Sequence, residues 1–206
     1  MAEGGDMPGC CDADHYAGGV DRRQRRVLWI VLTINAVMFV VLMAAALWGK
    51  TAALFADSFD NLGDAATYAI SLWAVGKGAS EKAKVSLFKG VLILAAACAI
   101  LINVVYKFLD PQIPVFEIMG LFSALALVAN LVCLALLWRH RSDDLNMESV
   151  WHCSRNDIAT NISVFIAAGL VWYFNSWWPD VIVAGCLAIL LFSSAFKIIV
   201  KSFSDL

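Results

Sequence analysis

The sequence predicts an all-α integral membrane protein with six transmembrane helices and both termini in the cytoplasm. Of its 206 residues, 61% are hydrophobic, and the mean hydropathy is +0.76. Ordinary soluble domains are about 45–50% apolar, so lipid is the expected solvent. The chain also has six predominantly apolar runs of about 20 residues, the length that crosses a bilayer: Val27–Trp48, Leu54–Val75, Val85–Tyr106, Val115–Trp138, Val150–Tyr173 and Val181–Val200.

The first run is expected to stay as a helix rather than to be removed as a secretory signal. Ala44–Ala46 resembles a cleavage region, but the uncharged stretch between Arg26 and Lys50 is longer than the usual apolar region of about 7–15 residues. We therefore expect a cytoplasmic tail over residues 1–26 and one transmembrane domain over residues 27–206.

The second run contains three aspartates, Asp57, Asp60 and Asp64. At about 100° per residue, their side chains share one helix face within roughly 60°. A charge in hydrocarbon costs at least about 2.5–3.5 kcal/mol, and ionisable residues inside spanning helices normally mark an ion or proton site. This face is therefore the first candidate for a functional site.

The third and fourth runs are more uniformly apolar. They are separated by a turn over Lys107–Pro114, which contains two prolines. Ala95 and Ala99 form a small-xxx-small pattern through which two copies of the helix could associate. Cys98 and Cys133 stand alone among apolar residues, and we interpret them, like Cys186 in the sixth run, as packing residues.

The fifth run follows a polar loop over Arg139–Asn146, and a turn over Asn175–Asp180 leads on to the sixth. The fifth run carries a second polar cluster near its start, formed by His152, Cys153, Arg155, Asn156 and Asp157. Two acidic clusters in one hydrophobic chain predict a divalent-cation site.

Basic residues predict the orientation. With the N-terminus inside, only Lys50 and Lys107 fall outside, and the positive-inside rule is satisfied. Tryptophans are expected at both interfaces, with Trp29 and Trp138 at the inner ends. The outer ends would carry Trp48, Trp172, Trp177 and Trp178. The inner basic residues would be Arg22, Arg23, Arg25, Arg26, Lys77, Lys82, Lys84, Lys89, Arg139, Arg141, Lys197 and Lys201.

The spacing of the polar residues predicts which of them hold the ion. Residues four apart lie on the same side of a helix, so Asp60 with Asp64, and Cys153 with Asp157, form two pairs of metal ligands. His152 points about 140° away from Asp157. We therefore prefer Cys153 as the fourth ligand. Three carboxylates and a thiolate suit Zn²⁺ or Cd²⁺ and disfavour Mg²⁺ or Ca²⁺.

Other roles stay open for these residues. Asp60, Asp64 and Asp157 could be structural, either paired with Arg155 or hydrogen-bonded to Asn61 and Asn156. Cys153 could simply pack. Asp57 lies one turn outward and is interpreted as an entry ligand, a proton carrier or a helix-start residue. His152 is a proton acceptor, a satisfied polar residue or the alternative ligand. Together Asp57 and His152 make up a predicted secondary metal or proton site.

The stretch Ala56–Asp64 resembles the second-helix signature of the cation diffusion facilitators. In that family two ligands stand four apart and face two more on the fifth helix, which here implies Asp60 and Asp64. The fifth helix usually carries His-x-x-x-Asp, where this chain has Cys153 and Asp157. The resemblance covers all six helices and implies a homodimer. The family normally adds a cytoplasmic metal-binding domain, which this chain, ending at Leu206, is expected to lack.

These observations predict a transporter that exports Zn²⁺, and Cd²⁺ with it, in exchange for external protons. Three neighbouring aspartates repel one another, so the empty site is expected to hold protons that a divalent cation displaces. If the site opens alternately to the two sides of the membrane, this displacement of protons by metal leads to metal/proton exchange. Two other classes stay open: a metal-binding sensor subunit that does not transport, and an intramembrane hydrolase, although a nucleophile motif is absent from the sequence. We expect no enzyme activity and no tightly bound cofactor.

The N-terminal tail is a further candidate for metal binding. It contains Cys10, Cys11, Asp12, Asp14 and His15, which could load metal at the cytoplasmic mouth or could be incidental. The expected partners are metal ions, protons, lipid and a second copy of the chain, with no nucleic acid. The expected location is a bacterial inner membrane.

Overall fold

The computed structural model describes residues 22–73, 79–139 and 145–204. Within these ranges the chain forms helices and no strand, which confirms the all-α prediction. The helices are α1 (Arg22–Gly49), α2 (Ala52–Trp73), α3 (Ala79–Leu109), α4 (Phe116–Trp138), α5 (Leu145–Phe174) and α6 (Trp178–Ser204). Each of them overlaps one predicted apolar run.

Five of the described helices are long and apolar enough to cross a bilayer, and α2 is not among them. The reason is that α2 carries Asp57, Asp60, Asn61 and Asp64, which lower its hydropathy. The composition thus supports a multi-pass membrane protein. That α2 is a sixth span stays a prediction.

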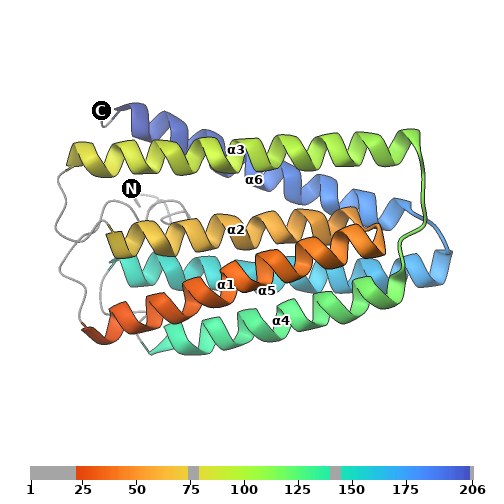
Figure 1. Ribbon diagram of the computed structural model, residues 1–206, viewed down its shortest axis with the longest axis horizontal. Coiled ribbons are helices and arrows are strands. Elements are labelled where there is room, and N and C mark those ends of the chain that lie inside the picture. The colour runs from red at the N-terminus through yellow and green to blue at the C-terminus, as the bar shows by residue number, and fades with distance from the viewer. Residues whose placement is uncertain (1–21, 74–78, 140–144, 205–206) are drawn as a thin grey trace, which may run out of the picture.

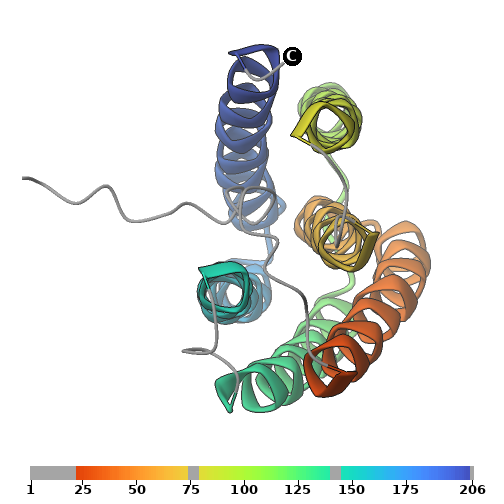
Figure 2. The same cartoon turned by 90° about the vertical axis from the view of Figure 1, so that its left-hand side faces the viewer.

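The helices form an elongated bundle in which each helix runs antiparallel to the next, so the start of α1 and the end of α6 lie at the same end (Figure 1). The closest pairs are α1 with α2, α3 with α6, and α4 with α5. In the end-on view α2 lies between the other helices (Figure 2), and it contacts all five. Its carboxylates are therefore held inside protein rather than in lipid.

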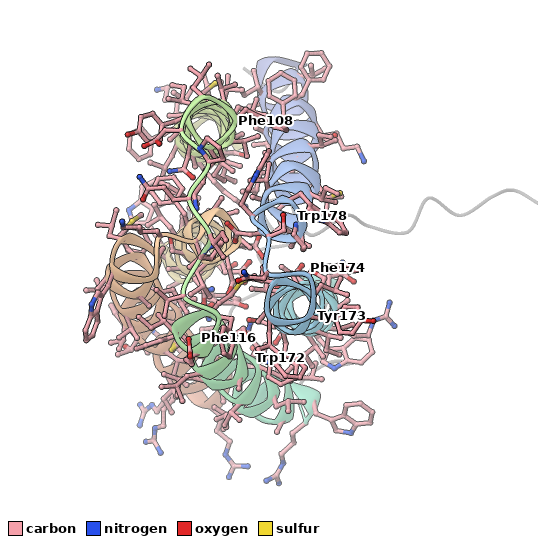
Figure 3. The ribbon with its side chains drawn as sticks, turned by 90° about the vertical axis from the view of Figure 1, so that its right-hand side faces the viewer. Phe108, Phe116, Trp172, Tyr173, Phe174 and Trp178 are labelled. Atoms are coloured by element: carbon pink, nitrogen blue, oxygen red, sulfur yellow. The ribbon has the colours of Figure 1, made fainter. Side chains whose placement is uncertain are left out.

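Aromatic side chains gather at the end of the bundle that the sequence predicts to be external. Figure 3 shows six of them there, from α3 to α6. Trp172 and Tyr173 are largely exposed, as expected for residues at a membrane–water interface. The labelled side chains are Phe108, Phe116, Trp172, Tyr173, Phe174 and Trp178.

Small residues bring the helices close together in the core, which includes Ala45, Ala46, Ala52, Ala53 and Ala56 of α1 and α2. Such residues let backbones approach where no hydrophobic effect drives helices together. The prediction that the isolated cysteines pack inside is right for Cys133, which is buried, and wrong for Cys98 and Cys186, which are exposed. Apolar surroundings in the sequence cannot separate a core face from a lipid-facing one, because both are apolar.

The sixth helix begins earlier than predicted, since α6 starts at Trp178 and includes Pro179 and Asp180 in its first turn. Proline is tolerated there because the first N–H groups of a helix have no partner within it. The turn between α5 and α6 is therefore shorter than the predicted Asn175–Asp180. It contains Asn175 in the left-handed region, with φ 45°.

Asp180 caps the start of α2, at the end of the bundle predicted to be external, rather than its own helix. Its carboxylate accepts hydrogen bonds from the Thr51 hydroxyl at 2.6 Å and from the backbone N–H groups of Ala52 at 2.7 Å and Ala53 at 2.9 Å. The Lys107 ammonium of α3 lies 3.6 Å from the same carboxylate and donates to the carbonyl oxygen of Lys50. This cluster, Thr51, Lys107 and Asp180, joins α2, α3 and α6 at one point and is called the outer cap below.

Candidate metal centre

The predicted site helices meet through two of the predicted ligands. The carboxyl groups of Asp64 on α2 and Asp157 on α5 are close enough to share a hydrogen bond. The Asp157 side chain is only 7% exposed, and that of Asp64 is half-buried. The structure therefore brings together one acid from each of the two clusters.

The other two aspartates of α2 extend the acidic face outward. Asp57 is fully buried, and neither of its carboxylate oxygens has a hydrogen-bond partner in the described part of the chain. The charge of Asp64 also acts on it. Asp60 is half-buried between them along the helix. Because α2 already begins at Ala52 and is capped by Asp180, the interpretation of Asp57 as a helix-start residue is excluded.

Two asparagines fix the helices beside the acids. The Asn61 amide donates to the carbonyl oxygen of Asp57 at 2.9 Å, and the Asn161 amide donates to the carbonyl oxygen of Asp157 at 2.7 Å. Side chains that bond back to the carbonyl one turn earlier often bend a helix. The same arrangement thus stands next to the acidic residues on both α2 and α5.

The remaining predicted ligands cannot be placed. The side chains of His152 and Cys153, and the tail residues Cys10, Cys11, Asp12, Asp14 and His15, lie outside the described residues. Among the side chains that are described, no three His, Cys, Asp or Glu residues cluster closely enough to hold a metal ion. The complete four-ligand set of Asp60, Asp64, Cys153 and Asp157 stays a prediction.

Arg155 is not positioned to pair with the aspartates, as a purely structural role for these acids would require. It lies on the exposed side of α5, with its guanidinium 5.4 Å from the centre of the Trp151 ring. Two residues along a helix differ by about 200° in direction, so Arg155 and the buried Asp157 face opposite sides of α5. The cation–π contact with Trp151 satisfies the arginine instead.

Three residues near Asp64 were missed by reasoning from the sequence. Lys89 of α3, which the sequence analysis counted among the basic residues of the cytoplasmic side, is only 2% exposed inside the bundle, and its charge acts on Asp64. Asp64 also acts on the buried thiol of Cys133 on α4. The Asn35 amide of α1 lies 3.9 Å from the Cys133 sulfur. The surroundings of Asp64 therefore include side chains from α3, α4 and α5, and Asn35 of α1 lies beside one of them.

A separate apolar hollow of about 500 Å³ lies on the outer face of α1 and is lined by seven residues from Arg26 to Met38. None of the predicted metal ligands lines it. Its place on an apolar helix face is that of a lipid-covered surface rather than of an ion site.

Comparison with known proteins identifies what the chain is similar to. A stretch of 133 residues is 29% identical to the vacuolar zinc transporter ZRC1 of Saccharomyces cerevisiae, covering 58% of this chain and 30% of that protein. The chain thus matches less than a third of the length of this relative. Residues 28–206 match the cation efflux transmembrane domain. Because that match spans all six helices, the protein belongs to the cation efflux, or cation diffusion facilitator, family, whose members transport metal cations across membranes.

Proposed function

We propose that the protein exports divalent transition-metal ions, Zn²⁺ and also Cd²⁺, from the cytoplasm in exchange for external protons. The observation that carries the proposal is that Asp64 and Asp157, two acids from different helices, lie next to each other inside the bundle. Acids at this depth are costly unless they serve an ion or proton path.

The same contact supports proton exchange. Two carboxylates held close together repel one another, so the empty pair is expected to hold a proton on at least one of them. A divalent cation binds the deprotonated groups and releases that proton. Metal and proton therefore compete for Asp64 and Asp157, and alternating exposure of the two acids would couple metal export to proton entry.

The metal preference rests on the donors proposed for the site. Zn²⁺ accepts carboxylate, thiolate and imidazole ligands, and a thiolate from Cys153 would favour Zn²⁺ and Cd²⁺ over Mg²⁺ or Ca²⁺. The yeast relative is named as a zinc transporter. We further propose a homodimer formed through the helices, with Ala95 of α3 exposed and so open to a partner.

The proposal is tested by metal-driven proton flux in proteoliposomes that contain a pH-sensitive dye. Asp64→Asn and Asp157→Asn should each reduce Zn²⁺-dependent proton flux to the level of empty liposomes, because each removes one proposed ligand and its ionisable proton. Glu117→Gln is the matched control: Glu117 is an exposed acid in the first turn of α4, and its loss should leave the flux unchanged.

Two results would refute the proposal. Wild-type flux from either aspartate variant would show that the meeting point of α2 and α5 is not the transport site. Zn²⁺ binding by the wild-type protein without any proton flux would instead identify a non-transporting metal-binding subunit.

A further inference from the structure

Lys89 is a buried cation that the proposed transport site does not use. Its side chain is 2% exposed, and its ammonium nitrogen has no hydrogen-bond partner among the residues that the structure describes. Burying a charge without a partner is costly, and such groups are normally paired. The position of Lys89 therefore needs an explanation other than packing.

The neighbourhood of Lys89 supplies one. The charge of Lys89 acts on the carboxyl group of Asp64. The charge of Asp64 acts in turn on Asp57, whose oxygens have no hydrogen-bond partner among the described residues. Gly90, the next residue, lets α6 approach so closely that an added Cβ would lie 2.8 Å from Ile199. One turn after Lys89, Ile93 of α3 lies 3.8 Å from the position of a Cβ added at Gly63, the neighbour of Asp64 on α2. Lys89 is thus buried on the part of α3 that packs against α6 and against the acidic segment of α2.

We propose that Lys89 is a built-in counter-charge of the transport site, which balances the acids when the site is empty and opposes the divalent cation when it is filled. The inference rests on the proposed function. A fixed positive charge near a bound cation weakens its binding in a medium of low dielectric constant. A transporter must also release its ion, and Lys89 favours release by the same repulsion.

The experiment compares Zn²⁺ binding and transport by Lys89→Met, Lys89→Gln and Lys89→Arg. The neutral variants should bind Zn²⁺ about tenfold more tightly or better, by isothermal titration in detergent, because one repulsive charge is removed. In proteoliposomes they should lower KM and also lower kcat, since release slows. Lys89→Arg should stay within about threefold of wild-type affinity because the charge is kept. Lys197→Met, which removes an exposed lysine from α6, is the matched control and should change neither value.

A purely structural role would have a different signature. Damage to packing weakens binding or lowers kcat without lowering KM, so it cannot imitate tighter binding combined with slower turnover. Unchanged or weaker affinity in folded Lys89→Met and Lys89→Gln would overturn the inference. Failure of the wild-type protein to bind Zn²⁺ would refute the proposed function instead, so the two failures are distinguishable.

A second measurement avoids substitution of the buried lysine. In wild-type protein labelled with ¹⁵N at the lysine side chains, Zn²⁺ should shift the Lys89 resonance more than that of Lys197. Equal shifts at saturating Zn²⁺ would place Lys89 away from the ion and would overturn the inference even if the neutral variants do not fold.

Discussion

Removing the carboxylate of Asp180 should destabilise the whole protein, although Asp180 lies far along the chain from the helix that it caps. In Asp180→Ala the backbone N–H groups of Ala52 and Ala53 and the Thr51 hydroxyl lose their acceptor. Loss of an N-cap alone costs about 1 kcal/mol. Breaking a buried ion pair by removing one partner costs about 3–5 kcal/mol. Because Lys107 keeps its hydrogen bond to the carbonyl of Lys50, we expect the lower end, about 3 kcal/mol.

The assay is equilibrium unfolding in detergent micelles, followed by tryptophan fluorescence. Asp110→Ala, which removes an exposed acid from the same end of the bundle, is the control and should cost about 0.5 kcal/mol or less. In a double-mutant cycle, Lys107→Met should cost clearly less in the Asp180→Ala background than in the wild type. A change below about 1 kcal/mol for Asp180→Ala would refute the idea that the outer cap holds α2, α3 and α6 together.

Three further predictions concern other parts of the chain. Gly90→Ala should lower the unfolding free energy by about 1 kcal/mol, because overpacking against Ile199 costs about 1–3 kcal/mol and exceeds the helix-propensity gain of about 0.5–1 kcal/mol. The control is Gly185→Ala, which has nothing within 4 Å of the new Cβ and should be stabilising in the same unfolding assay. Cys153→Ser should reduce Cd²⁺ affinity more than Zn²⁺ affinity in titrations if the thiol is a ligand, and an unchanged ratio would make it a packing residue. Deletion of residues 1–15 should weaken apparent metal affinity in transport assays while activity persists, and complete loss of activity in inserted protein would contradict a loading role for the tail.

The sequence predicts the helices well because the bilayer requires about 20 apolar residues for each span. It predicts their ends less well. The third helix already begins at Ala79 and the fifth at Leu145, both before the apolar runs start. A helix continues into polar residues wherever its backbone hydrogen bonds can still form. Hydropathy detects only the part of the helix that lies inside lipid.

The candidate site was also predicted only in part. Asp64 and Asp157 could be paired from the sequence because their helical spacing and the cost of intramembrane charge indicate one shared site. The partners of Lys89 and Asp180 could not be predicted, because the sign of a charge does not reveal whether its side chain faces water or a neighbouring helix. Lys89 was grouped with the basic residues of the cytoplasmic side, and Asp180 with turn residues, since their partners lie on helices distant in the sequence.

The outer cap has a mechanical consequence for α2. A helix tied at one end and able to move at the other acts as a lever, and the tie here is at Ala52 and Ala53. At 1.5 Å per residue, Asp64 lies about 18 Å from that fulcrum and Trp73 about 32 Å. A tilt of about 10° would displace the acid by about 3 Å and the far end of the helix by about 5.5 Å. The first displacement is enough to separate Asp64 from Asp157, and the second would change access at the opposite, predicted cytoplasmic end of the bundle, so one small rotation would link entry of the ion from that end to the geometry of the two acids.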